Sequence, residues 1–353
     1  AGSRATLAVR GRLAQHPPAM REGYGMTTLD GRAGGFRRRG LLAGATLLGL
    51  PVPALAQAPR FPERPIEIVV GFVAGGGTDL DARSYARALE GRIGGTVIIS
   101  NRPGAGGELA LGAVARARPD GHTIGTTNFP GILTIPIERQ AQFKLADFAP
   151  LANIVTDPSA ITTHVDSPYR SLADVIEKAK AAPDTITYAS PGIGSDDHMQ
   201  LVLLQQAAGI RLTHVVYQGD PQLRTALLGR QVDLIGLNLG QVTATPDKMR
   251  MLAQGGATRS RFQPEVPTLK ELGFPVEMAS ERGLVMPAGT PPAILARLRE
   301  ATADIAKDPG FIRQLESRFT VPLFEPGEAW FDRLRREEAR FRQIWQATPW
   351  LQR

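Results

Sequence analysis

The sequence predicts an α/β protein of two lobes, each a mainly parallel sheet flanked by helices, with two segments that cross between the lobes. Strand-like and helix-like segments alternate along the chain, and short links join them. The alternation starts again near residue 171 and forms a second unit of the same kind. Short βαβ links favour parallel strands and right-handed crossovers. The 353-residue chain is also long enough to bury two cores.

Hydrophobic patterns place the elements of each unit. Short β-branched runs predict strands, and amphipathic segments bounded by Pro, Gly or Ser predict helices. The first unit is expected to run 66–70 (strand), 81–92 (helix), 96–99 (strand), 108–117 (helix) and 122–127 (strand). The second is expected to run 172–182 (helix), 185–189 (strand), 197–208 (helix), 211–217 (strand), 222–228 (helix), 232–238 (strand) and 249–254 (strand).

The end of the chain is expected to return to the first lobe. After a strand at 283–286 come three helices, each with a proline at or beside its start, at 291–307, 309–318 and 326–346. Segments near 150–165 and 275–285 are expected to cross between the lobes. The expected boundaries are 57–155 with 281–353 for lobe 1, which is discontinuous, and 156–280 for lobe 2.

Residues 1–56 are predicted to be an export signal with upstream sequence, and not part of the fold. They hold eight arginines and two acids, whereas the whole chain has a net charge of +7, so the remaining body is nearly neutral. Arginines at 37–39 precede an uncharged apolar run at 41–50, and small residues at 54 and 56 predict cleavage before Gln57. The consecutive arginines favour the twin-arginine route to the periplasm, with an ordinary Sec signal as the alternative, and Met26 is the expected start.

Composition excludes several functions for the body. Nucleic-acid binding needs clustered Lys and Arg, which a nearly neutral body does not supply. The absence of cysteine excludes disulfides, thiolate nucleophiles and Cys-ligated metals. No stretch after the leader reaches 18 apolar residues, so the exported body is expected to be soluble.

The strongest ligand signal is the glycine loop at 71–79, between the first strand and the first helix. The glycines at 75–77 let backbone amides approach a ligand with no Cβ in the way. The helix that follows adds unpaired N–H groups and the positive end of its dipole, a combination that binds anions. A P-loop would need Lys where Thr78 stands, and a dinucleotide fingerprint would need Gly or Ala where Leu80 stands. The alternative to an anion site is a tight turn without a ligand.

Three further loops follow strands of the second unit, at 190–198, 217–221 and 238–241. Ligands of α/β sheets bind beyond the carboxyl ends of the strands, so we expect these loops and the first one to meet in a cleft between the lobes. The serine at 195 can cap a helix or donate its hydroxyl to a carboxylate. Residues at strand ends become candidates for the same cleft, namely Asn128, Ser190, Tyr217 and Asn238.

Catalysis is the rival function. Ser195 and His198 lie three residues apart at a helix start, a spacing that suits capping better than a nucleophile–base pair. His198 and His214 could hold a metal with an acid at 196 or 197, but a locally bonded histidine is the simpler interpretation. Asp79 could be a general base, although capping or accepting a bond from a ligand is expected. We therefore expect no enzyme, metal or cofactor, and a periplasmic hydrolase or a stand-alone carboxylate sensor stays open as the alternative.

An ordered set of motifs resembles the substrate-binding proteins of tripartite tricarboxylate transporters, the Bug or TctC-type family of extracytoplasmic receptors. The likeness covers about 61–347, which is almost the whole body. Any one motif is weak, and their order along the chain makes the set specific. The motifs include Gly75-Gly76 with Asp79 and Arg83, the run from Asn101 to Gly107, the run from Ser190 to His198, Tyr217-x-Gly219, Pro267-Thr268, and the run from Pro287 to Pro291.

The resemblance implies a type II-like periplasmic-binding-protein fold with a carboxylate in the cleft. The ligand would be a di- or tricarboxylate or an aromatic carboxylate, delivered by a monomeric receptor to a membrane permease. In that family, amides of the glycine loops hold the carboxylates. By position, the implied contacts are Gly75, Gly76, Gly77, Thr78 and Asp79 in lobe 1, and Gly194, Ser195, His198, Gly219 and Asp220 in lobe 2.

Two residues leave open questions about the ligand. Asp220 stands where a second glycine commonly follows Gly219 in the family, so it could disfavour a second carboxylate or accept a bond from a ligand amine or hydroxyl. Arg282 could face the cleft and strengthen carboxylate binding, or it could pair with Glu281.

Overall fold

The computed structural model describes residues 61–246 and 248–350, which belong to one compact unit, Gln57–Arg353. The expected export signal, its cleavage point and the start at Met26 lie outside these residues. Within the described ranges, no helix combines the length and apolar character that a membrane span requires.

Lobe 1 begins with three parallel strands, as the alternating pattern predicts. β1 (Ile66–Val70) lies in the centre and pairs with β2 (Val97–Asn101) and β3 (Thr123–Phe129). The connecting helices are α1 (Gly77–Ile93), the 3₁₀ turn η1 (Ala105–Gly107) with α2 (Glu108–Ala115), and α3 (Gly131–Glu138). The helix α1 begins four residues earlier than the apolar stripe indicates, because Gly76 is the extended N-cap and Gly77 occupies the first turn.

Lobe 2 repeats this plan. β5 (Thr187–Ser190) pairs in parallel with β6 (Thr213–Val216) and β7 (Leu234–Asn238). Ser171 caps the first helix and Gly209 ends the second one, as predicted. The helices are α4 (Leu172–Ala181), α5 (Asp196–Ala208), α6 (Asp220–Leu228) and α7 (Leu239–Ala244).

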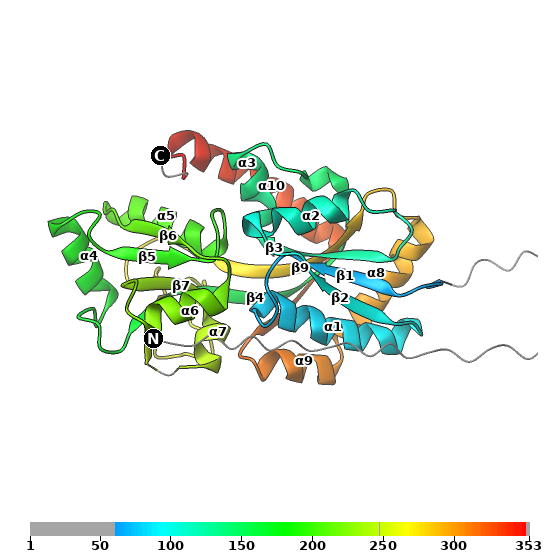
Figure 1. Cartoon of the computed structure of the whole chain (residues 1–353), viewed down its shortest axis with the longest axis horizontal. Helices are drawn as coiled ribbons and strands as arrows, with labels where there is room; N and C mark the ends of the chain where they lie inside the picture. The colour runs from blue at the N-terminus through cyan, green and yellow to red at the C-terminus, as the bar shows by residue number, and fades with distance from the viewer. Residues whose placement is uncertain (1–60, 247, 351–353) are drawn as a thin grey trace, which may run out of the picture. The chain divides into compact units, whose positions relative to one another are not determined.

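Two long strands connect the lobes, and they coincide with the two expected crossing segments (Figure 1). β4 (Phe148–His164) and β9 (Ala279–Pro287) pair antiparallel to each other. β9 also pairs with β3, and β4 pairs with β7 and with β8 (Met249–Gln254), so the described strands follow the order β2-β1-β3-β9-β4-β7-β5-β6. The parallel groups of the two lobes are thus joined by antiparallel strands into one mixed sheet. The exact lobe boundaries stay a prediction.

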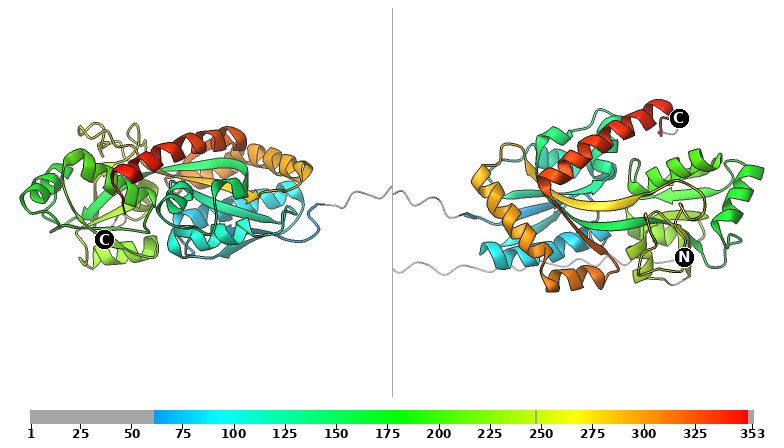
Figure 2. Two further views of the ribbon diagram at one scale, coloured as in Figure 1. Left: turned by 90° about the horizontal axis from the view of Figure 1, so that it is seen from above. Right: turned by 180° about the vertical axis from the view of Figure 1, so that it is seen from behind.

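The chain returns to lobe 1 at its end, in the elements α8 (Pro292–Ala306), α9 (Pro309–Glu316), β10 (Val321–Pro326) and α10 (Gly327–Ala347). α10 packs against β4 and α3 (Figure 2). Its predicted apolar face is confirmed, because Trp330, Leu334 and Phe341 are buried. The indole of Trp330 occupies the space beside Gly283, where a Cβ would overlap it.

Each lobe buries apolar side chains on both faces of its strands. In lobe 1, α1, α8 and α9 cover one face of the sheet, and α2, α3 and α10 cover the other. In lobe 2, α4 and α5 contribute to one core, and α6 and α7 contribute to the other. This layering holds the carboxyl ends of the parallel strands in fixed positions, from which the loops toward the other lobe start.

Candidate functional site

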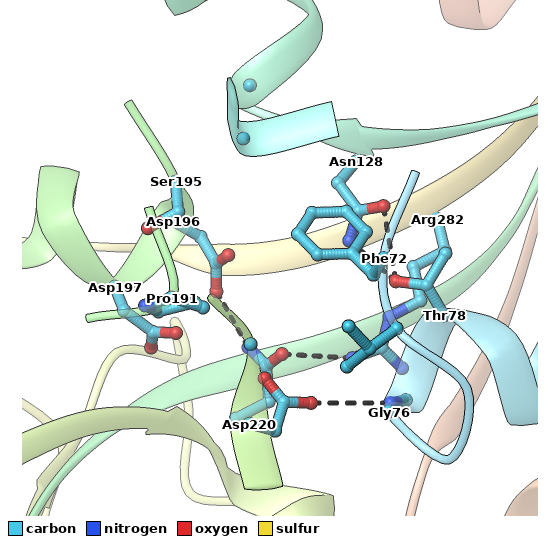
Figure 3. A pocket seen from close by; sticks show the side chains of 16 residues that line it. Phe72, Gly76, Thr78, Asn128, Pro191, Ser195, Asp196, Asp197, Asp220 and Arg282 are labelled. Atoms are coloured by element: carbon cyan, nitrogen blue, oxygen red, sulfur yellow. Dashed lines mark hydrogen bonds between the residues drawn. The ribbon is translucent and has the colours of Figure 1, made fainter. Parts of the chain in front are cut away.

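The glycine loops of the two lobes meet at one cavity, at the starts of α1, α5 and α6 (Figure 3). Its volume is about 30 Å³, which is room for about two water molecules. Residues of both lobes and of the crossing strand β9 line it. Of the residues expected from the sequence, the lining includes Gly76, Gly77, Thr78, Asn128, Ser195, Gly219, Asp220, Asn238 and Arg282.

A wider hollow of about 300 Å³ adjoins the cavity. The two share five lining residues, drawn from both lobes, and Tyr217 lines the hollow and not the cavity. The cavity and the hollow are therefore neighbouring spaces between the same loops of the two lobes.

Gly77 forms the first-lobe wall at a very tight point. A Cβ on Gly77 would lie 2.5 Å from Nε2 of Gln241 and 2.7 Å from Nη2 of Arg282. The N–H of Gly77 donates to the carboxylate of Asp220 at 3.4 Å, and Asp220 belongs to the other lobe. A protein carboxylate thus lies at the N-terminus of α1, where the sequence predicts an anion.

Gly75 and Asp79 support this loop from outside the cavity. The Asp79 carboxylate accepts hydrogen bonds from the Gly75 amide, from Arg83 and from Asn101, each at 2.9 Å. Burial acts to raise the pKa of Asp79, but these donors hold its pKa below the ordinary value. Asp79 is therefore an ionised anchor of the loop.

Thr78 and Asn128 form a fixed polar wall. The amide nitrogen of Asn128 donates to the Thr78 hydroxyl at 3.0 Å and to the Ser280 hydroxyl on β9 at 3.1 Å. The side chains of α1, β3 and β9 are thereby held in one arrangement beside the cavity.

Three acids dominate the second-lobe wall. Asp196 accepts from the Ser159 hydroxyl at 2.6 Å and from the Asn238 amide at 2.7 Å. Asp197 is buried beside it, and its Oδ1 has no hydrogen-bond partner among the described residues. Burial raises the pKa of both carboxyls, and for Asp197 the neighbouring carboxylates of Asp196 and Asp220 add to the effect. Burial also raises the pKa of Asp220, although Arg282 and the Gly77 amide act in the opposite direction.

Ser190, His198 and His214 do not line the cavity. The ring of His198 stacks on His214 with the centroids 4.1 Å apart, and its Nδ1 accepts the Gly194 N–H at 3.0 Å. Nε2 of His214 lies 2.7 Å from Oγ of Ser190. Burial lowers the pKa of both rings, that of His214 to about 4. Both rings are therefore neutral supports of the loop at physiological pH.

Ser195 caps α5, as the spacing to His198 indicates. Its Oγ accepts the backbone N–H of His198 at 3.2 Å, so the contact does not involve the imidazole ring. The geometry of a serine activated by a histidine base is thus not formed between these two residues.

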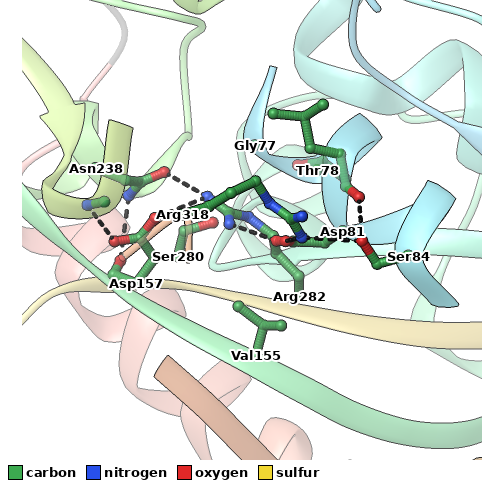
Figure 4. Close-up of polar contacts among 12 residues, drawn as sticks. Gly77, Thr78, Asp81, Ser84, Val155, Asp157, Asn238, Ser280, Arg282 and Arg318 are labelled. Atoms are coloured by element: carbon green, nitrogen blue, oxygen red, sulfur yellow. Dashed lines mark hydrogen bonds and ion pairs between the residues drawn. The ribbon is translucent and has the colours of Figure 1, made fainter. Parts of the chain in front are cut away.

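Arg282 connects the lobes beneath the cavity (Figure 4). Its guanidinium donates to Asp81 on α1 at 2.7 Å, to Asp157 on β4 at 3.3 Å and to Asn238 on β7 at 2.9 Å. Burial opposes the charge on Arg282, but Asp81 and Asp157 raise its pKa above the ordinary value. Glu281, the alternative partner of Arg282, instead forms an ion pair with Arg333. Arg282 itself lines the cavity.

Asp157 gives this network a pH dependence. Burial raises the pKa of Asp157 to about 7, despite the nearby Arg282 and the hydrogen bond from the Gly240 amide. The folded protein therefore keeps a proton on Asp157 that the unfolded chain releases near pH 4. The stabilisation from this proton is complete below pH 4 and is lost as the pH rises to about 7.

We expect Asp157→Asn to remove this dependence. Relative to the unmodified protein, the variant should gain stability as the pH rises from 4 to 7, by about 4 kcal/mol at most. Urea unfolding of both proteins at several pH values measures the difference, in which the opposite contributions of His198 and His214 cancel. A difference that does not change with pH would show that Asp157 is ionised throughout.

Several residues of the site give a weaker signal in the sequence. From the sequence, Asp196 and Asp197 are ordinary acids in the first turn of a helix. Their position beside a cavity depends on how the two lobes meet. Asp81 and Asp157 belong to an amphipathic helix and to an apolar strand, and an acid inside such a strand is the one signal that points to a buried ion pair. Gly75, Asp79, Ser190, Gly194, His198 and Tyr217 are brought near the cavity but do not line it. Across residues 61–246 and 248–350, no group of three or more His, Asp or Glu side chains is placed to hold a metal ion.

Comparisons with known proteins give one family. The family model described as "Tripartite tricarboxylate transporter family receptor" matches residues 82–344. A curated relative from Cupriavidus necator, "UPF0065 protein in gbd 5'region", is 34% identical over 290 residues and covers 81% of this chain and 88% of its own length.

Two solved structures have the same fold over most of their length. The periplasmic binding protein BugD is 30% identical with a TM-score of 0.76, over 81% of this chain and 98% of BugD. A Rhodopseudomonas palustris protein with adipate is 28% identical with a TM-score of 0.75, over 81% of this chain and 97% of that one. The paired glycine loops, the crossing strands and these matches lead to one conclusion: the chain belongs to the receptor family of the tripartite tricarboxylate transporters.

Proposed function

We propose that this protein is a periplasmic receptor that captures a small organic carboxylate between its lobes and delivers it to the membrane permease of a tripartite tricarboxylate transporter. The observation that carries the proposal is the convergence of three helix N-termini, from both lobes, on one cavity. Helix N-termini and glycine-loop amides are suited to hold a carboxylate. The adipate in the R. palustris relative supports the same ligand class.

Capture requires the lobes to separate and close. Pockets for small molecules usually measure about 300–1,000 Å³, so a cavity of about 30 Å³ represents a closed arrangement that a ligand enters only after opening. The Thr134 hydroxyl donates to the Gly194 carbonyl at 2.6 Å across the interface, and such contacts would form and break in each cycle. A ligand that touches both walls shifts the population toward the closed state.

We also propose that the protein is exported, and that it binds and releases its ligand without converting it. The 1–56 segment would direct the protein to the periplasm by the twin-arginine route, and the mature monomer would need no cofactor. Neither histidine reaches the cavity, and the Ser195 hydroxyl is bound as a helix cap, which supports capture over hydrolysis.

A thermal-shift screen tests this function. Mono-, di-, tricarboxylates and aromatic carboxylates are added to the purified protein, and at least one should raise the melting temperature. A ligand at about 100 times its Kd adds about 2.7 kcal/mol to the free energy of unfolding. The bound acid should be recovered unchanged after prolonged incubation. A response to sugars alone, or conversion of the acid in proportion to protein, would contradict the proposal.

A further inference from the structure

We propose that the captured carboxylate also carries a positively charged nitrogen, so that the ligand is an aminocarboxylate and not a di- or tricarboxylate. This inference rests on the proposed function and specifies its ligand class. It starts from the charges on the cavity wall. Asp196, Asp197 and Asp220 line the cavity, and Arg282 is the one cationic residue among the described lining residues.

The single cation is already engaged. Two nitrogens of the Arg282 guanidinium contact Asp81, Asp157 and Asn238, which leaves Nε as its buried donor without a partner among the described residues. The wall therefore carries more acidic than basic groups, and a cation placed beside these buried carboxyls would favour their ionised form. A molecule with two or three carboxylates would add like charges to this wall, which is unfavourable in a buried site.

Asp220 already supplies a carboxylate to the glycine loop of lobe 1. It starts α6, and its Oδ2 accepts the Gly77 N–H at the N-terminus of α1. One carboxylate thus lies between the N-termini of two helices that belong to different lobes. A ligand needs no second carboxylate there, and a positively charged group would instead find Asp220 as an acceptor.

Asp197 supplies the independent observation. Its side chain lines the cavity with 1% of the residue exposed, and Oδ1 has no donor among the described residues. Within that described part of the lining, Asp197 and Arg282 are the residues with a buried, unpartnered side-chain atom, one acceptor and one donor. An ammonium group beside Asp197 and a carboxylate near Arg282 and the glycine-loop amides would satisfy both.

The test compares ligands of equal length that differ at one end. Calorimetry measures the affinities for 4-aminobutyrate against succinate, 5-aminopentanoate against glutarate, and 6-aminohexanoate against adipate, together with the common L-amino acids. We expect an aminocarboxylate to bind at least about 10-fold tighter than any dicarboxylate. Asp197→Asn and Asp220→Asn should each weaken its binding by about 30-fold or more, because each removes one partner of a buried charge pair.

The control is Asp184→Asn, which changes an exposed acid of lobe 2 paired with Arg211 and should leave the affinities unchanged. Melting curves of all variants establish that they fold. Tighter binding of a dicarboxylate, with affinity unchanged in Asp197→Asn and Asp220→Asn, overturns the inference and leaves the proposed function intact. No binding of any carboxylate, with or without an amine, overturns both. A melting shift with calcium chloride alone would assign the acids to a metal and also overturn the inference.

Discussion

Replacing Arg282 with methionine is expected to lower the free energy of unfolding by about 3–5 kcal/mol. The guanidinium is buried and donates to Asp81 and Asp157, which come from α1 and from the crossing strand β4. Methionine fills similar space but leaves the buried Asp157 without its counter-charge, and it removes one of the two cations bound to Asp81, which keeps Arg318. Removing one member of a buried ionic group costs far more than the intact group contributes, because the remaining charge cannot reach water.

Urea unfolding, followed by circular dichroism, measures this loss. The matched control is Arg64→Met, since Arg64 forms a single ion pair with Asp120 in which the two side chains are 52% and 39% exposed. The control should change stability by less than about 1 kcal/mol. Arg282→Lys separates charge from geometry, because a lysine keeps the charge but cannot form the same fork of hydrogen bonds. Equal effects of Arg282→Met and Arg64→Met would show that Arg282 carries no structural charge network.

Part of this molecule follows from local composition and could be predicted from the sequence, and part could not. The strand–glycine–helix order at 66–80 and again at 187–198 follows from local composition, and both loops lie at the carboxyl ends of parallel strands as predicted. Local rules suffice there because backbone conformation and a neighbouring helix start decide the arrangement.

Long-range pairing could not be derived in the same way. The sequence gives β4 only as a crossing segment, although it is a single strand of 17 residues with Pro150 and Pro158 inside it. Proline normally argues against a central strand, and here the pairing register shifts near Pro150. α3 was also not predicted, because its apolar, β-branched run contains Pro136 and lacks a polar face.

The gathering of acids around the cavity could not be predicted from the sequence either. First-turn aspartates at a helix start are ordinary, and their role as caps or dipole partners accounts for Asp196, Asp197 and Asp220 one at a time. What makes them unusual is that they gather in one buried place, which depends on how two lobes meet. Charge density at a site formed by several loops is a property of tertiary structure, and the sequence offers only the individual charges.

Replacing Gly77 with alanine is expected to weaken ligand binding roughly 10- to 100-fold while the protein stays folded. A Cβ at this position would lie 2.5 Å from Gln241 Nε2 and 2.7 Å from Arg282 Nη2. Gln241 can rotate away at some cost, but the guanidinium is fixed by its bonds to Asp81 and Asp157, so the added carbon has to displace the network. The overlap with Gln241 crosses the lobes and arises on closure, whereas Arg282 lies in lobe 1 with Gly77, so the overlap with the guanidinium is present in the open protein as well. The methyl group therefore costs the open protein some stability, which melting curves measure, and it costs the closed state more because Gln241 is then displaced as well.

Gly91→Ala is the matched control, because Gly91 lies in the same helix and no heavy atom would come within 4 Å of the added Cβ. It should stabilise the protein by about 0.5–1 kcal/mol and leave the affinity unchanged. Calorimetry with the carboxylate that gives the largest thermal shift measures binding, and small-angle scattering measures the compaction on ligand addition. Both signals should be lost or reduced in Gly77→Ala and kept in Gly91→Ala. Normal binding and compaction in Gly77→Ala would mean that the ligand-bound state differs from the closed arrangement around Arg282, because a rigid contact of this kind cannot accept an extra carbon without a measurable cost.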